Sequence, residues 1–133
     1  MKVTLDQETL QIISMFQKLT GCTVVDSIAN EELYFVVAEG QFGMAVGKNG
    51  SKIKNAEKVF KKQIKIFEYA QDVEKFIKNI VPDVQEIKRS ENEIIIKVKP
   101  ADRSKIIGKD GKNIKTINRF LERLYGIKEM KVK

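Results

Sequence analysis

Two short turns in this chain combine glycine and lysine in the same pattern. The turn at Gly47–Gly50 reads GKNG, and 61 residues later Gly108–Gly111 reads GKDG. Glycine lets a backbone turn sharply and lets another backbone approach closely. The start of a helix offers free N–H groups and the positive end of the helix dipole, both of which favour a phosphate. With Lys52 and Lys112 following in the first helical turn, the pattern predicts two sites that hold a nucleic-acid backbone.

Two other interpretations of these turns fit less well. A plain connection between two helices would need glycine for its geometry alone, but it would not need lysine at the same place in both copies. A nucleotide-hydrolysing P-loop is suggested by Gly43–Asn49, but only three residues separate its glycines, and Asn49 replaces the Ser or Thr that binds magnesium. Phosphate binding without hydrolysis therefore remains the better interpretation.

The composition argues against most catalytic and metal-binding chemistry. The chain contains a single cysteine, Cys22, and no histidine. An internal disulfide, a Cys-rich zinc site and His-based acid–base catalysis are therefore excluded. We expect no catalytic residues, no metal and no cofactor, and hence a protein that is not an enzyme.

The distribution of charge favours a polyanionic partner. The formal net charge is +7 across 133 residues, and a basic balance of this kind suits nucleic acid. Seven of the nine lysines in residues 1–69 fall between Lys48 and Lys65, directly after the first glycine turn. No apolar run approaches the roughly 20 residues that a membrane span requires, and acidic residues stand where a signal peptide would be apolar. We therefore expect a cytoplasmic protein without a membrane partner.

The elements that must position the two turns form an internal duplication. At an offset of 61, the apolar run at 33–37 falls on 94–98, and Ile53 falls on Ile114. The match continues without a gap to Ile66 and Ile127 in the last expected strand of each copy. Agreement of this length predicts two domains, at residues 1–69 and 70–133. Because only Tyr-Ala-Gln at 69–71 separates them, we expect the two halves to be held together with little slack.

Hydrophobic periodicity predicts the same element order in both halves: helix, strand, strand, helix, turn, helix, strand. In the first half a capping box at 4–7 starts a helix that Gly21 ends, and strands follow near 22–28 and 33–38. A short helix leads into the turn, a long helix reaches about residue 62, and the third strand covers 64–69. Gly40 and Gly43 indicate either a mobile short helix or the close approach of another surface.

In the second half a helix over 73–81 is stopped by Pro82. Strands are expected near 84–88 and 94–99, and Pro100 suits the first turn of the short helix. The long helix then holds the apolar residues of 114–125, Gly126 ends it, and a strand covers 127–132.

The residues around the turns resemble a known signature. IIGKDGKNI at 106–114 is similar to the KH-domain pattern V/I-I-G-x-x-G-x-x-I, and AVGKNGSKI at 45–53 departs from it only by Ala45. The element order resembles the type II, prokaryotic arrangement of that family. This implies an α+β fold of two tandem KH domains, each a three-stranded sheet with helices on one face. Such a pair is similar to the archaeal form of the transcription factor NusA.

This resemblance implies single-stranded RNA binding through two Gly-x-x-Gly loops, in transcription elongation or termination, with RNA polymerase or the transcription complex as a partner. Ribosome assembly or RNA turnover, and a protein-interaction scaffold, are the alternatives. Val46 with Ile53, and Ile107 with Ile114, are expected to support the loops from the core side. The predicted RNA-binding residues are Gly47, Lys48, Asn49, Gly50, Lys52, Gly108, Lys109, Asp110, Gly111 and Lys112.

Overall fold

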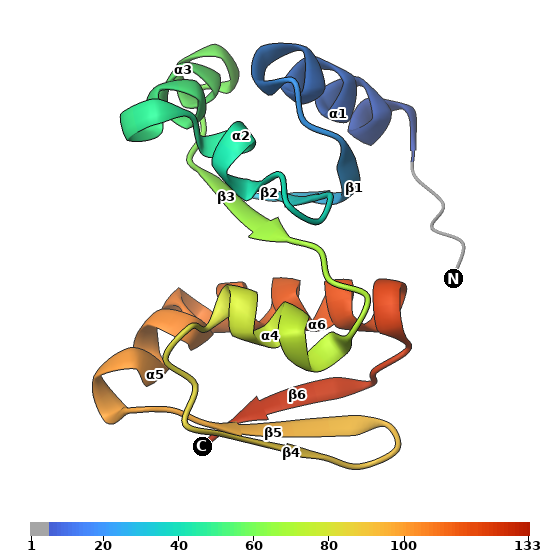
Figure 1. Cartoon of the computed structure of the whole chain (residues 1–133), viewed down its shortest axis with the longest axis vertical. Helices are drawn as coiled ribbons and strands as arrows, with labels where there is room; N and C mark the ends of the chain where they lie inside the picture. Colours follow the sequence, from blue (N-terminus) through green and yellow to red (C-terminus); the bar gives the residue numbers. More distant parts are fainter. Residues whose placement is uncertain (1–5) are drawn as a thin grey trace. The chain divides into compact units, whose positions relative to one another are not determined.

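The computed structural model describes residues 6–133 of the chain. These residues form two compact units, the first ending at Gln71 and the second running from Asp72 to Lys133. Each unit consists of helices packed on a three-stranded sheet (Figure 1). The units are described separately below.

The first unit begins with a helix that has clear signals at both ends. The carboxylate of Asp6 caps α1 by accepting a hydrogen bond of 2.7 Å from the Thr9 N–H. The capping box predicted from Thr4 lies partly outside the described residues. Gly21 ends the helix as predicted, with a left-handed φ of 79°. The elements of this unit are α1 (Gln7–Thr20), β1 (Val24–Ala29), β2 (Leu33–Val37), α2 (Phe42–Val46), a 3₁₀ turn (Lys48–Gly50), α3 (Ser51–Phe60) and β3 (Ile64–Glu68).

The second unit repeats this order. Asp72 caps its first helix, Pro100 begins its short helix, and Gly126, with a φ of 71°, ends its long helix. The last two features confirm the predicted start and stop signals. The elements are α4 (Val73–Ile80), β4 (Glu86–Arg89), β5 (Glu93–Lys97), α5 (Pro100–Ile107), a 3₁₀ turn (Lys109–Gly111), α6 (Lys112–Tyr125) and β6 (Glu129–Val132).

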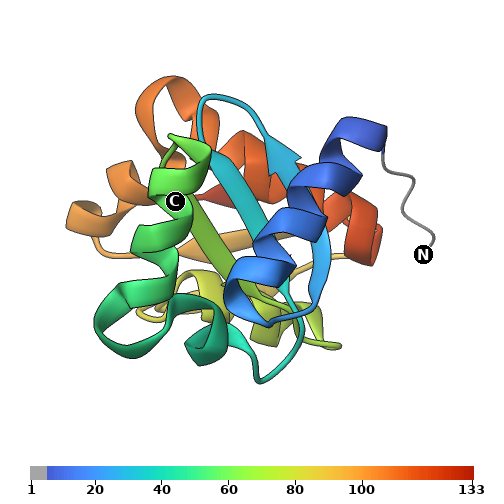
Figure 2. The same cartoon turned by 90° about the horizontal axis from the view of Figure 1, so that it is seen from above.

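The two sheets have the same topology. In the first, β2 is central, antiparallel to β1 and parallel to β3; in the second, β5 is central, antiparallel to β4 and parallel to β6. Within each unit the helices cover one face of the sheet (Figure 1), and the view in Figure 2 shows α1 and α3 side by side across the first sheet. The predicted α+β fold, with three-stranded sheets and helices on one face, is confirmed.

The predicted match of the third strands was wrong. Leu33 pairs with Ile64 in the first sheet, whereas its counterpart Ile94 pairs with Met130 in the second. Met130 stands 66 residues after Ile64, so the offset of 61 ends before this strand. The cause is α6, which has 14 residues where α3 has 10, about one extra turn. Ile127 is buried in the connection that follows α6, where it fills the core without belonging to a strand.

The helix-facing side of each sheet supplies the core. In the first unit Phe16 of α1 stacks on Phe35 of β2, with ring centroids 3.9 Å apart, and Phe60 of α3 packs beside them. In the second unit, Phe76 of α4 contacts Tyr125 of α6 at 5.1 Å between centroids. Ile94 and Ile96 of the central strand are fully buried. These contacts fix the two long helices, and with them the loops at their N-terminal ends.

Candidate nucleic-acid interface

The two glycine loops have the same backbone conformation. The first glycines, Gly47 and Gly108, have φ and ψ of 78° and 170°, and of 76° and 171°. The second glycines, Gly50 and Gly111, are left-handed, with φ of 73° in both. Each loop is closed by the same two hydrogen bonds: from the first glycine to the residue four before it, and from the second glycine to the first. The repeated sequence therefore encodes one loop structure twice.

The first glycine of each loop is required by geometry. A Cβ on Gly47 would lie 2.7 Å from the Cγ of Lys52 and 2.9 Å from its backbone nitrogen. On Gly108 it would lie 2.8 Å from the Cβ of Asn113. The φ and ψ of both glycines also fall in a region that is essentially restricted to glycine. The long helix therefore starts in direct contact with the loop backbone.

A third residue in each loop has a positive φ. Asn49 has φ 55° and ψ 29°, and Asp110 has φ 57° and ψ 24°. Asn and Asp are the non-glycine residues that tolerate this left-handed conformation best. The left-handed backbone thus explains why aspartate is found at position 110, although Asp110 places a negative charge where an anion is expected.

The long helices lack a side-chain cap at their N-terminal ends. Neither Gly50 at the start of α3 nor Gly111 at the start of α6 provides one, whereas Asp6 and Asp72 cap α1 and α4. The first N–H of each long helix donates within the loop instead, from Ser51 to the Lys48 carbonyl and from Lys112 to the Lys109 carbonyl. Each loop therefore lies at the positive end of a helix dipole, which favours negative charge.

Two lysines that the sequence analysis did not select lie against the second glycine of each loop. The Cε of Lys54 is 3.6 Å from a Cβ built on Gly50, and the Cε of Lys115 is 3.7 Å from a Cβ built on Gly111. The Lys54 ammonium also donates to the Asn49 carbonyl at 3.4 Å. Their signal was present in the sequence, since both stand four residues after the second glycine.

The predicted lysines lie in different surroundings. Lys48 and Lys109 are exposed at the loop tips, and Lys112 is half-buried. The Lys52 ammonium donates to the carbonyl of Thr20, at the end of α1, over 2.9 Å. The corresponding residue of the second unit is Asn113, whose amide donates to the Ile106 carbonyl at 2.8 Å. This position ties the start of the long helix to the structure before it in both units.

Comparison with known proteins gives these loops a family context. The sequence pattern of the KH domain matches residues 12–86 and again residues 68–133. The chain is 40% identical to the "Probable transcription termination protein NusA" of Methanococcus vannielii, covering 99% of this chain and 80% of that protein. The chain belongs to the family of archaeal NusA-like proteins with tandem KH domains.

Other members agree with this assignment. The NusA proteins of the same printed name from Methanocaldococcus jannaschii and Thermoplasma acidophilum are 36% and 30% identical to the chain. The alignments cover 98% and 99% of this chain, and 75% and 96% of those proteins. The crystal structure of APE1850 matches with a TM-score of 0.78 at 32% identity, over 97% of this chain and all of that one.

In both KH domains, apolar residues flank the loop. Val46 and Ile53 are half-buried and pack against the core of the first domain, as predicted. Ile107 and Ile114 occupy the corresponding positions of the second domain and are also half-buried. Gly43 in α2 has no described atom within 4 Å of a Cβ built on it, so packing within the described chain does not explain this glycine.

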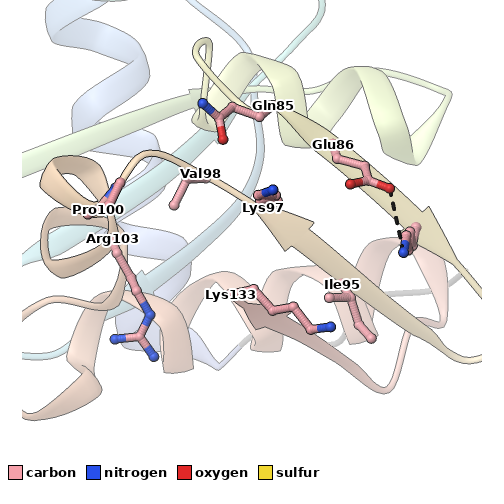
Figure 3. A pocket seen from close by; sticks show the side chains of 9 residues that line it. Gln85, Glu86, Ile95, Lys97, Val98, Pro100, Arg103 and Lys133 are labelled. Atoms are coloured by element: carbon pink, nitrogen blue, oxygen red, sulfur yellow. Dashed lines mark ion pairs between the residues drawn. The ribbon is translucent and has the colours of Figure 1, made fainter.

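A separate concave surface of the second KH domain lies on the face of the sheet away from the helices (Figure 3). Ile95, Val98 and Pro100 provide its apolar lining, and Arg103 and Lys133 reach it from α5 and from the end of the chain. None of the predicted RNA-binding residues lines it. This surface is therefore distinct from the two loops.

Neither a metal-binding group nor a membrane-spanning helix is found between residues 6 and 133. Within that range no three His, Cys, Asp or Glu side chains gather into a group able to hold a metal ion. None of the helices described there combines the length and apolar character needed to cross a bilayer.

Proposed function

We propose that this chain is a non-enzymatic cytoplasmic factor that binds single-stranded RNA through its two Gly-x-x-Gly loops. The observation that carries the proposal is the shared loop structure: the same backbone conformation, an uncapped helix N-terminus and an exposed lysine, occurring twice. KH domains clamp about four nucleotides with such a loop. Membership of the KH family supports RNA as the ligand.

In the proposed complex the phosphates lie along the loops. Gly47 and Gly108 keep the backbone free of side chains, and the positive ends of the α3 and α6 dipoles attract the phosphate oxygens. Lys48 and Lys109 add charge at the loop tips, and Lys112 adds charge at the first turn of α6. Lys52 joins this set by exchanging its bond with the Thr20 carbonyl for a phosphate. The remaining proposed contacts are Asn49, Gly50, Asp110 and Gly111.

The names of the relatives support a role in transcription termination. We propose that this role extends to elongation and that RNA polymerase or the transcription complex is the partner. Capture of partners from a native lysate tests this role. Recovery of RNA polymerase subunits with the wild-type chain is the expected result. Recovery of ribosomal subunits or nucleases in their place would assign the RNA binding to ribosome assembly or RNA turnover.

The loops themselves are tested by aspartate substitution. Lys48→Asp with Asn49→Asp gives the first loop two acids, and Lys109→Asp alone does the same in the second, because Asp110 is already present. Aspartate tolerates the conformation of residue 49, so the fold is retained, which circular dichroism checks. We expect the triple variant to lose at least tenfold in affinity for a fluorescent single-stranded RNA. Wild-type affinity in a folded triple variant would overturn the proposal.

A further inference from the structure

A dense group of lysines lies along α3 and in the two residues that follow it, beyond the first loop. Lys54, Lys58, Lys61 and Lys62 line a shallow concavity of about 550 Å³ together with Glu57 and Gln63. We call these four lysines the α3 lysine surface. It starts with Lys54, which lies against Gly50 of the loop, and extends to the C-terminal end of the helix. A helix of 10 residues is about 15 Å long, so the surface continues well past the loop.

The described lining of this surface carries four lysines and one acid, Glu57. The nearby acid Glu57 accepts a hydrogen bond from the Ile64 N–H at 3.0 Å, and the Lys62 ammonium donates to the Asn30 carbonyl at 2.8 Å. Among residues 6–133, no ion-pair partner is found for Lys58 or Lys61. The charge at the middle and the end of α3 is therefore available to an external anion.

The local structure is unfavourable for the helix itself. Lys54 and Lys58 stand four residues apart in α3, a spacing at which like charges destabilise a helix. Lys61 has φ 58° and ψ 37°, a left-handed conformation that glycine adopts without strain. The end of α6 has Gly126 in this role. The helix dipole favours a cation at a helix C-terminus. It does not remove the backbone strain of a left-handed lysine, which glycine would avoid.

Local rules are broken most often where a surface has a function. In the second KH domain the aligned positions hold Lys115, Arg119, Glu122 and Arg123. The basic face therefore recurs in both long helices, whereas the left-handed lysine at position 61 is particular to the first domain, since α6 ends at Gly126.

We infer that the α3 lysine surface binds the phosphate backbone of the RNA strand beyond the nucleotides held by the first loop. This inference rests on the proposed function and adds a path for the strand: from the Gly47–Gly50 loop, past Lys54, to Lys58 and Lys61. The surface is electrostatic and contains no aromatic side chain. It therefore lengthens the binding site without adding base specificity.

The test combines Lys58→Ala with Lys61→Gly and uses RNAs of two lengths. One RNA has roughly four nucleotides, enough for a single loop, and the other is about three times longer. For the longer RNA we expect a five- to tenfold loss of affinity. We also expect the slope of log affinity against log salt to become shallower by about 1.4, since single strands contribute about 0.7 per phosphate. For the short RNA we expect no change.

The control is Lys18→Ala with Lys78→Ala, which removes the same charge from exposed positions of α1 and α4. Lys61→Gly relieves the left-handed lysine, so thermal unfolding of the test variant should be no lower than that of the wild type. Equal loss in the test and control variants, or equal loss for both RNA lengths, would overturn the inference.

Failure of this inference is distinguishable from failure of the proposed function. If Lys48→Asp with Asn49→Asp weakens binding of the longer RNA and removes one of the two sites for the short RNA, while the α3 variant matches the control, the loop binds RNA and the surface does not. If the loop variant binds like the wild type, the proposed function itself is wrong.

Discussion

The residue before the second glycine limits how each loop can vary. Asn49 and Asp110 share a left-handed backbone, so the position excludes β-branched and bulky side chains while accepting either a neutral amide or an acid. The glycines were evident from the motif. The left-handed conformation of the second variable position of each loop was not evident, because the Gly-x-x-Gly pattern treats its two variable positions as equivalent. On charge alone, Asp110 looked out of place beside a phosphate.

Replacing Asp110 with Asn should strengthen RNA binding. Asparagine keeps the left-handed conformation and removes a negative charge from the phosphate site. We expect a gain of roughly two- to fivefold, the scale of an exposed charge interaction, measured by fluorescence anisotropy at low salt. Asn49→Asp should produce a loss of similar size, and both effects should shrink as salt screens the charges. Equal affinities of wild type and both variants would show that this side chain does not face the RNA.

The two glycines of one loop should differ in their tolerance of alanine. Gly47→Ala combines a glycine-only conformation with contacts of 2.7 and 2.9 Å to Lys52, so it should cost more than about 2 kcal/mol in the free energy of unfolding. Gly50→Ala meets no described atom closer than 3.6 Å and should cost about 1 kcal/mol for its left-handed φ. Urea unfolding measures both values. The reverse order would contradict the assigned roles.

At the scale of the elements, helix capping separates the structural helices from those that follow the loops. Aspartate caps α1 and α4, while α3 and α6 begin at glycine without a side-chain cap. The order and type of the elements could be predicted because periodicity, Gly21, Pro100 and Gly126 all gave consistent signals. The register of the third strand could not be predicted, because Ile127 aligns with an apolar position of β3. In the structure Ile127 is buried in the core before β6 begins.

Hydrogen bonds between the long helices and the third strands also show which residues of β3 and β6 correspond. Glu57 of α3 accepts from the Ile64 N–H, and Asn118 of α6, its counterpart 61 residues on, accepts from the Met130 N–H at 2.9 Å. Each side chain thus ties its helix to the same place in its third strand. These hydrogen bonds depend on tertiary contacts, which no local pattern in the sequence reveals.

The cap of α1 makes stability depend on pH. The hydrogen bonds that Thr9 donates lower the pKa of the Asp6 carboxyl. A carboxyl with a lowered pKa in the folded state stabilises fully above its unfolded pKa, about 3.9. This stabilisation is lost as the pH falls through the folded value. Asp6→Ala should therefore lower the Tm at pH 7, and this difference should disappear at acidic pH.

Asp6→Asn serves as the matched control, because asparagine also caps helices well but does not titrate. Its Tm should stay near that of the wild type at neutral pH and should vary less below about pH 4. A constant difference between Asp6→Ala and wild type across the whole range would refute the role of the charged form.

For the whole molecule, the important property is that two loops of the same design are joined in one chain. When one strand engages both, the second contact forms at a high effective concentration, so the combined affinity exceeds that of either loop. The short connection between the halves, at 69–71, suggested in sequence terms that they are held with little slack. That remains a prediction.

The loss of affinity caused by substituting one loop should therefore depend on the length of the RNA. With a long strand, Lys48→Asp with Asn49→Asp, or Lys109→Asp alone, should each lower the affinity by more than tenfold through loss of the joint contact. With an RNA of roughly four nucleotides, each variant should mainly halve the number of sites while leaving the affinity of the intact loop unchanged. Isothermal titration calorimetry measures both quantities. Loss of all binding from one substituted loop would contradict two independent sites.

The parallel pairing of each third strand also sets an order of events during protein synthesis. The first sheet is complete once Glu68 has been made, whereas the second needs β6, which ends at Val132. At about 5–20 residues per second, the ribosome takes several seconds to add the segment between these strands. The first KH domain can therefore complete its sheet and its loop while the second still consists of the β4–β5 hairpin without β6. During its synthesis this chain thus gains its two loops one after the other.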